Sequence, residues 1–267
     1  MNNINLCQYN VVDVASHTSY NPLFFDENMP STMRGKHILV LGASGRLGSQ
    51  VVRQALDASY YVTTLVRNDR ALPFTRQQLR NPNLVICVGS IFSRTNLDRV
   101  IEGQDVVINC LGPRRSCEFN LLNFLGQRTS DIDLNSRAQR YINESMARLG
   151  VKRLIIVRCH GTSTLDSFFT RLFFSKMHNN DKKVQEKLIV ENSKFLDWTI
   201  VRVGGLSNGK LTKKYSLHDN DQIILKKVSR ADVAHFILKE VGNGTWIQRT
   251  PSIDATIFPT NGKKWYY

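Results

Sequence analysis

Three glycines follow an apolar run near the start of the chain, and they predict a turn that binds an anion. The run Ile38–Leu41 has the pattern of a strand buried on both faces, and a helical segment begins after the last glycine. Backbone N–H groups at such a helix start have no partner within the helix, and the helix dipole favours a pyrophosphate there. The glycine spacing is G-x-x-G-x-x-G rather than the G-x-G-x-x-G of the dinucleotide fingerprint, so a plain turn between strand and helix is the alternative. The candidate binding residues of the turn are Gly42, Ser44, Gly45, Arg46, Leu47 and Gly48.

A basic residue stands at the position that separates the two nicotinamide cofactors. Residues 61–66 form a second apolar run, which completes a βαβ pattern, and Arg67 follows it about 20 residues beyond the last glycine. A carboxylate there would bind the ribose hydroxyls of NAD(H), whereas a guanidinium binds the 2′-phosphate of NADP(H). Asn68 lies beside it, and Arg46 is a candidate second clamp. We therefore expect NADP(H) rather than NAD(H), the alternative being that Arg67 only ends a strand in solvent.

These stretches together resemble a known family. The similarity covers residues 35 to 250, and it is to the NAD(P)H-binding, atypical short-chain dehydrogenase/reductase family, with the NmrA-like proteins and the flavin/biliverdin reductase type B group as the nearest likeness. The motifs that carry it are LGASGRLG, LVRN, DVVINCLG (105–112), VKRLIIVRC (151–159), FLDWTIVRVGGLSNG (195–209) and VSRADVAHFIL (228–238). The fold implied is a Rossmann-type doubly wound parallel sheet, of seven strands, with a small C-terminal lobe.

The resemblance implies further cofactor contacts at the ends of later strands. An Asp often follows the glycine after the third strand in this family and holds the adenine, whereas this chain has Gly89-Ser90. The turn after the fourth strand lies against the nicotinamide-side phosphates and ribose, and the segment after the sixth strand lines the nicotinamide pocket. The residues predicted on this basis are Ser90, Ile91, Cys110, Leu111, Gly112, Val203 and Gly204.

The catalytic set of this superfamily, Ser with a Tyr-x-x-x-Lys pair, is altered in this chain. Cys159 occupies the Ser position, and a thiol is a weaker hydrogen-bond donor than a hydroxyl. His178 and Lys182 have the i, i+4 spacing of the Tyr/Lys pair, and His160 is a second candidate proton donor. The alternatives are that His178 and Lys182 are solvated residues opening a helix, and that water supplies the proton to a flavin or bilin acceptor. A redox or metal pair of Cys110 with Cys159 is a further alternative, but no ligand cluster supports a metal, and two buried thiols are favoured.

The remaining elements follow from periodicity. The pattern predicts a helix over residues 134–149, a short helix from Asn96 to residue 102, a helix over 230–241 capped by Ser229, and a last strand over 246–248. The loop 114–130 is either a substrate lid or a surface insertion.

At 267 residues with 42% hydrophobic content, the chain is long enough for one α/β domain. We expect a disordered or loosely docked extension over residues 1–33, a Rossmann domain with its small lobe over 34–250, and a tail over 251–267.

Composition and charge indicate the compartment of the protein and which classes of partner it binds. Five cysteines without framework spacing indicate reduced thiols, and the N-terminal segment reads as neither a signal nor a transit peptide, so we expect a cytoplasmic protein. No apolar run is long enough to span a membrane. The net charge of +14 raises the question of nucleic acid, but the basic residues are scattered, and a basic enzyme surface is favoured.

The expected function is that of an NADPH-dependent reductase that transfers a hydride to a small, planar conjugated acceptor of the flavin, quinone or bilin type. The alternative is a non-catalytic, NmrA-like protein that senses NADP(H) and acts through a protein partner. Because both must bind the dinucleotide, the glycine turn and Arg67 support them equally.

Overall fold

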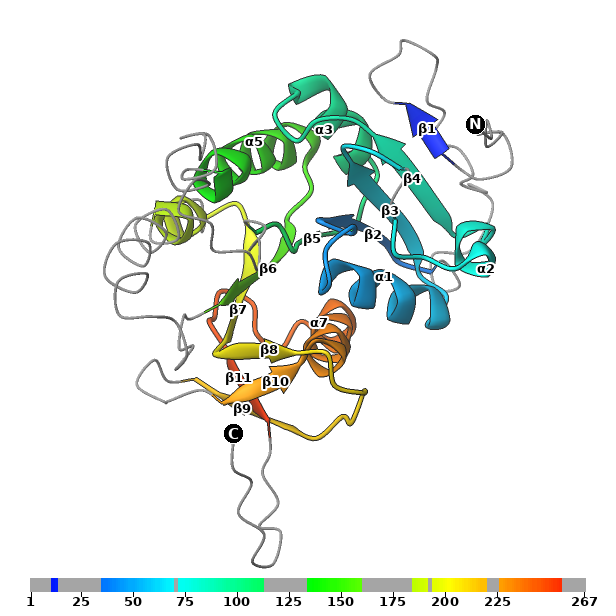
Figure 1. Ribbon diagram of the computed structural model, residues 1–267. Coiled ribbons are helices and arrows are strands. Elements are labelled where there is room, and N and C mark those ends of the chain that lie inside the picture. Colours follow the sequence, from blue (N-terminus) through cyan, green and yellow to red (C-terminus); the bar gives the residue numbers. More distant parts are fainter. Residues whose placement is uncertain are drawn as a thin grey trace, which may run out of the picture.

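The computed structural model describes residues 11–13, 35–69, 72–112, 134–159, 184–191, 194–219 and 226–255. Within these ranges nine strands form one twisted sheet at the centre of the molecule (Figure 1). Neighbouring strands run parallel except for the last pair, β11 and β9, which are antiparallel. Across the sheet, the order is β1 (Val11–Asp13), β4 (Leu84–Val88), β3 (Tyr61–Val66), β2 (His37–Leu41), β5 (Val106–Asn109), β6 (Arg153–Cys159), β7 (Asp197–Val203), β11 (Ser252–Ala255) and β9 (Tyr215–His218).

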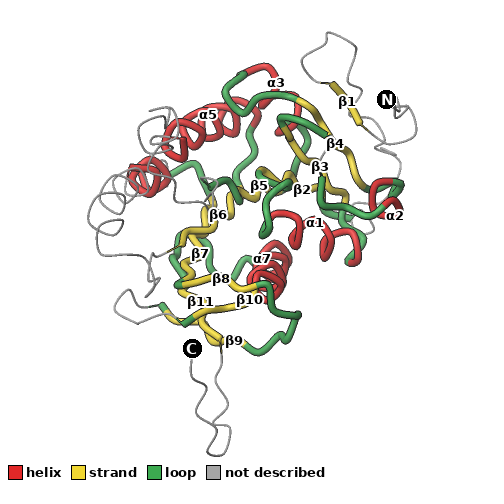
Figure 2. The backbone as a smooth tube through the Cα atoms, viewed as in Figure 1, coloured by secondary structure: helices red, strands yellow, loops and turns green. Residues whose placement is uncertain are grey.

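Helices cover both faces of the sheet, as the tube in Figure 2 shows. On one face lie α1 (Gly48–Asp57) and α7 (Arg230–Asn243); on the other lie α3 (Arg94–Ile101), α5 (Leu134–Leu149) and the helical residues 184–191. Helix α2 (Arg76–Leu79) is a short turn that precedes β4. The central strand β2 sends alternate side chains into the two cores, so an uninterrupted apolar run is the only pattern that satisfies both faces.

A small lobe follows β7. Its strands β8 (Gly205–Ser207) and β10 (Lys227–Ser229) pair in parallel as a separate two-stranded sheet. Asp232 of α7 holds this lobe, because its carboxylate accepts hydrogen bonds from the backbone N–H groups of Thr212 and Lys213 at 2.8 and 2.7 Å and from the Ser229 hydroxyl at 2.7 Å. Burial by itself would raise the pKa of Asp232, but these hydrogen bonds hold that pKa below its ordinary value.

The predicted Rossmann-type fold with a small C-terminal lobe is confirmed, but the expected sheet of seven parallel strands is corrected. The described sheet has nine strands, and its last strand is antiparallel. Part of the difference is β1, which adds to the free edge of β4 with Val11 opposite Ile86. These three residues belong to the extension expected over 1–33, whose other residues lie outside the described ranges. Local sequence does not reveal an edge strand of three residues.

Two element boundaries also differ from expectation. Residues 246–248 form a turn, and the last strand, β11, lies at residues 252–255, past the predicted domain boundary at residue 250. The Ser93 hydroxyl caps α3 by accepting from the backbone N–H of Asn96, so the helix begins at Arg94, two residues before the expected start at Asn96. The predicted cap of α7 is confirmed, since the Ser229 hydroxyl accepts from the backbone N–H of Asp232 at 2.9 Å.

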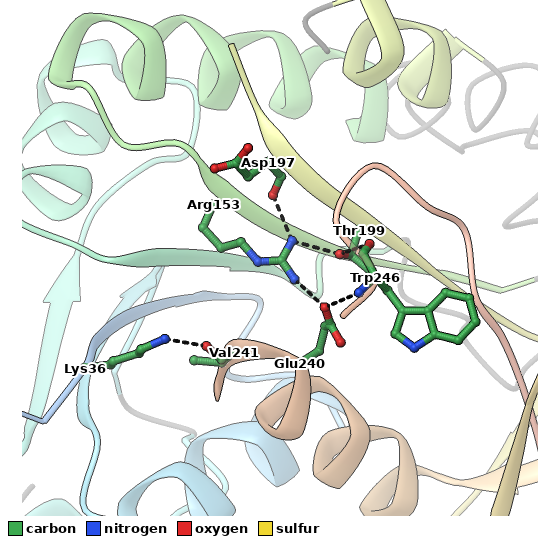
Figure 3. Close-up of polar contacts among 7 residues, drawn as sticks. All are labelled: Lys36, Arg153, Asp197, Thr199, Glu240, Val241 and Trp246. Atoms are coloured by element: carbon green, nitrogen blue, oxygen red, sulfur yellow. Dashed lines mark hydrogen bonds and ion pairs between the residues drawn. The ribbon is translucent and has the colours of Figure 1, made fainter. Parts of the chain in front are cut away.

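A buried ion pair and its hydrogen bonds hold Trp246 in this turn beside the sheet (Figure 3). The Arg153 guanidinium meets the Glu240 carboxylate at 3.0 Å, and that carboxylate also accepts from the Trp246 backbone N–H at 2.7 Å. The Thr199 hydroxyl donates to the Trp246 carbonyl at 2.6 Å, so two side chains hold the backbone of Trp246, while the Gln248 backbone N–H donates to the Trp198 carbonyl of β7 at 2.6 Å. Arg153 and Asp197 are the first residues of β6 and β7, so this cluster lies at the amino ends of the strands. It joins α7 to the sheet at the edge opposite the predicted binding residues.

Candidate NAD(P)H-binding site

The predicted binding residues gather at one edge of the sheet. Because β2 to β7 are parallel, their carboxyl ends lie side by side, with Leu41 opposite both Leu65 and Asn109, and Cys159 opposite Val203. Open α/β sheets bind their ligands at this edge. The structure therefore brings together the segments after β2, β3, β4, β5 and β7 that the sequence analysis assigned to the cofactor.

The turn after β2 is closed by backbone contacts that only glycine permits. Gly42 has a φ of +84°, and a Cβ added there would lie 2.7 Å from the Cys110 carbonyl oxygen and 3.0 Å from the Leu111 nitrogen. A Cβ on Gly48, the first residue of α1, would overlap the Gly42 carbonyl. The turn after β2 is thus packed directly on the turn after β5.

The outer part of this turn is open to an anion. Ser44, Gly45 and Arg46 are exposed, and the Gly45 backbone N–H donates to the Gly42 carbonyl at 2.9 Å, which folds the turn tightly. No side chain caps α1, whose first turn also carries no acidic residue. By contrast, side-chain hydroxyls cap the other helices whose start is described, α2, α3 and α7. A tight glycine cradle at an uncapped helix start fits a pyrophosphate, so the residues present suit a dinucleotide.

The residues predicted to bind the adenosine end of the cofactor follow β3 and β4. Arg67 and Asn68 are exposed directly after β3, one strand away from the glycine turn. The Gly89 backbone N–H donates to the Val66 carbonyl at 2.9 Å, so the turn after β4 is fixed against the end of β3. Ser90 is exposed, and its hydroxyl accepts from the Phe92 backbone N–H at 3.2 Å. Ile91 beside it is half-buried against the apolar core on the face of the sheet that α3 and α5 cover.

A buried asparagine that the sequence analysis did not single out organises the turn after β5. Asn109 ends that strand and is 1% exposed; its side-chain oxygen accepts from the Leu111 backbone N–H at 3.0 Å. The Cys110 backbone N–H donates to the Leu41 carbonyl at 2.9 Å, while Gly112 is exposed. The available signal was the polar residue that ends the apolar run DVVIN, since a polar side chain buried there needs a partner.

The cysteines of the described part do not provide a nucleophile. Burial raises the pKa of the Cys110 thiol to about 12, and the same cause raises that of Cys87 to about 12, so both are protonated at neutral pH. The backbone of Cys159 ends β6 opposite Val203. The Cys159 side chain and the candidates His160, His178 and Lys182 lie outside the described residues, so their catalytic role stays a prediction.

At the end of β7, one face of the sheet carries apolar core residues and the other carries a cluster of ion pairs. Val203 is fully buried in the α1–α7 core and Gly204 is buried beside it, so a cofactor contact there would use their backbone. On the opposite face, Arg158 and Arg202 are register partners on β6 and β7, and both form ion pairs with Glu186, the second of them at 2.7 Å. Burial, and then the nearby Arg202 charge, lower the pKa of Arg158. Glu186 thereby fastens the helical residues 184–191 across the two strands, an arrangement the sequence analysis did not anticipate.

With this geometry established, comparison with known proteins decides the family. Residues 42–243, most of the chain, match the family described as NAD(P)H-binding. The chain belongs to this NAD(P)H-binding family.

Solved structures of this family's fold resemble the chain over most of its length. A Rossmann-fold NAD(P)-binding family protein from Shigella flexneri superposes with a TM-score of 0.63 at 21% identity, covering 87% of this chain and 98% of that one. A wide-type short-chain dehydrogenase/reductase from Veillonella parvula, solved in complex with NADP, gives a TM-score of 0.64 at 16% identity, covering 84% and 95%. At these identities the likeness shows the fold.

Among curated proteins, the photosystem II assembly factor Ycf39 of Synechocystis is 24% identical over 214 residues. The match takes in 76% of this chain and 58% of that protein, so the chain spans less than two thirds of its relative. None of the helices that the structure describes is long and apolar enough to cross a membrane.

Proposed function

We propose that the chain is an NADPH-dependent reductase that delivers a hydride to a planar, conjugated acceptor such as a flavin, quinone or bilin. The observation that carries the choice of NADPH is the exposed Arg67 at the end of β3, one strand from the glycine turn. A guanidinium there favours the 2′-phosphate through charge-assisted hydrogen bonds. Within the family, the motifs favour the NmrA-like and flavin/biliverdin reductase type B groups.

Each described segment of the edge has a role in holding this cofactor. The backbone of Gly42 to Gly48 and the start of α1 hold the pyrophosphate, and Arg67, with Arg46, holds the 2′-phosphate. The turn Cys110–Gly112, fixed by Asn109, lies against the glycine turn and supports the nicotinamide side. Once bound, the reduced dinucleotide supplies the hydride.

The choice of acceptor rests on which proton donors the edge offers. Among the described residues, the three that follow each of β2, β3, β4, β5 and β7 include no tyrosine, histidine or lysine; the residues after β6, His160 among them, lie outside the described ranges. The Cys110 thiol is a poor acid, because its pKa is raised to about 12. A conjugated acceptor suits such an edge, since water can protonate it after hydride transfer while the protein holds the two ring systems together.

A second candidate is favoured by the curated relative. Ycf39 is named as an assembly factor, and an edge whose described residues after β2, β3, β4, β5 and β7 include no tyrosine, histidine or lysine also suits a protein that binds NADP(H) without catalysis. In that case the chain reports the nucleotide state to a protein partner.

The deciding experiment uses the purified full chain with NADPH and a panel of flavins, quinones and bilins. Binding is measured by titration calorimetry, and turnover by loss of absorbance at the reduced nicotinamide band. We expect NADPH to bind and at least one conjugated acceptor to be reduced. Tight NADPH binding with no reduction of any acceptor would support the second candidate, and no binding of either nicotinamide cofactor would refute both.

A further inference from the structure

A continuous line of buried side-chain amides runs from the turn after β5 to the helical residues 184–191. It begins at Asn109, whose oxygen accepts from the Leu111 backbone N–H and whose nitrogen donates to the Gln139 oxygen at 2.9 Å. Gln139 on α5 in turn donates to the Asn143 oxygen at 2.7 Å. Asn143 then donates to the Leu188 carbonyl at 3.1 Å. We call these three residues, Asn109, Gln139 and Asn143, the amide relay.

The relay has one internally consistent orientation. Each amide uses its oxygen toward the β5 turn and its nitrogen toward residues 184–191, so rotating any one of them would set two donors or two acceptors against each other. Gln139 and Asn143 stand four residues apart on α5 and therefore share one side of that helix. Hydrogen bonds in such a chain polarise and strengthen one another when water is excluded.

Gln139 is the centre of the relay. It is fully buried, and its oxygen also accepts a hydrogen bond from the Gln185 side chain at 3.3 Å, so it binds the strand end and residues 184–191 at once. Asn109, Asn143 and Gln185 are buried as well, at 1, 6 and 7% exposure. A change at Gln139 would leave donors on two separate elements without a partner, and an unpaired buried donor is costly.

We propose that Gln139 is a positioning residue that couples the nucleotide-binding turn to the anchoring of residues 184–191. The proposal rests on the proposed function, because the β5 turn packs on Gly42 and there supports the dinucleotide. Nucleotide seated at Leu111 and Gly112 stabilises the first hydrogen bond of the relay, and the relay passes this to Leu188 and Gln185.

The test compares Gln139→Met, which keeps the side-chain volume and removes both hydrogen-bonding groups, with Gln104→Met. Gln104 is also a buried glutamine, 8% exposed, and it donates to the Thr63 hydroxyl at 3.2 Å, away from the relay. Hydrogen exchange is followed residue by residue with and without NADPH. In the wild type, NADPH must slow exchange both at Cys110–Gly112 and at residues 184–191.

We expect Gln139→Met to raise the dissociation constant of NADPH about tenfold and to abolish the NADPH-induced slowing of hydrogen exchange at residues 184–191. In Gln104→Met, the dissociation constant and the slowing of exchange should both stay within twofold of the wild type. NADPH slowing residues 184–191 equally in Gln139→Met, or equal effects of the two variants, would overturn the proposal. If Gln139→Met does not fold, Gln185→Met replaces it, and NADPH must then slow exchange at residues 184–191 less than it does in the wild type; an unchanged slowing there would overturn the proposal.

Failure of the proposed function is distinguishable from failure of the relay. If the wild type binds no NADPH, the relay is judged from exchange without nucleotide. Gln139→Met must then accelerate exchange at Leu111 and at residues 184–191 together, and acceleration at one end alone would refute the coupling.

Discussion

Replacing Gly42 with alanine should damage both the fold and nucleotide binding, and the structure gives the size of each effect. The residue has a φ of +84°, and holding an L-residue in the left-handed region costs about 1–2 kcal/mol. The added methyl group would also lie 2.7 Å from the Cys110 carbonyl, where ordinary contacts begin near 3.4 Å, so the turns after β2 and β5 must separate. We expect Gly42→Ala to lower the free energy of unfolding by about 3 kcal/mol, because the strain and the overlap add.

Gly150 provides the matched control. It follows α5 with a φ of +73°, but a Cβ there would meet nothing within 4 Å, so Gly150→Ala carries the backbone strain without the overlap. Gly150→Ala should therefore lower the free energy of unfolding by only about 1 kcal/mol. Thermal unfolding separates the two variants, since each kcal/mol shifts the midpoint by about 2–4 °C in a domain of this size.

Nucleotide affinity separates them further. By titration calorimetry, Gly42→Ala should weaken NADPH binding by more than about thirtyfold, because both turns that hold the cofactor move, whereas Gly150→Ala should bind within twofold of the wild type. Equal destabilisation by the two variants would show that the backbone contact of Gly42 with Cys110 is unimportant. Unchanged affinity in Gly42→Ala would show that the turn does not hold the cofactor.

Three further predictions concern charge and titration. Arg67→Asp should weaken NADPH binding about thirtyfold or more and NADH binding less than threefold, because only NADPH carries the 2′-phosphate; equal losses in calorimetry would contradict the cofactor assignment. Alkylation of Cys110, followed by peptide mass spectrometry, should be slow at pH 7 and rise about tenfold per pH unit up to pH 9, since its pKa is about 12; a plateau near pH 8 would contradict that value. Asp232 has a lowered pKa in the folded state, so its stabilisation is present above the unfolded value of about 3.9 and is lost as pH falls below it. Urea unfolding of Asp232→Asn should therefore show lower stability at pH 7 and a shallower loss from pH 5 to pH 2, and an unchanged acid dependence would rule out this contribution.

The amino ends and the carboxyl ends of the parallel strands have different roles in this molecule. At the amino ends, Arg153 and Glu240 fasten α7 to β6 through a buried ion pair, and the Arg153 guanidinium also donates to the Asp197 carbonyl. At the carboxyl ends, glycine contacts and the amide relay shape the turns that are predicted to bind the nucleotide. Mutations at the amino ends should therefore act through stability alone, and mutations at the carboxyl ends should lower nucleotide affinity as well.

Sequence patterns within a short stretch of the chain are enough to predict the first βαβ unit. The apolar run before Gly42, the glycine turn, the start of α1 and the strand ending at Arg67 lie within 30 residues of one another, and each is recognisable from its neighbours. The cap of α7 by Ser229 is local in the same way, because its hydroxyl bonds the backbone three residues ahead. The sequence by itself therefore determined the fold class, the NAD(P)H-binding family and the glycine turn that is predicted to bind the nucleotide.

Only the tertiary structure decided which distant residues meet. Arg153 pairs with Glu240 across 87 positions, Asn109 with Gln139 across 30, and Arg202 with Glu186 across 16 on a different element. The partner of a buried charged or amide side chain cannot be predicted from sequence periodicity. Burial of such a side chain becomes favourable only when strands and helices have packed around it and supplied its hydrogen-bond partners. For the same reason β1 and β11 joined the sheet without a local signal, since a strand of three or four residues is stabilised by the edge that it meets rather than by its own sequence.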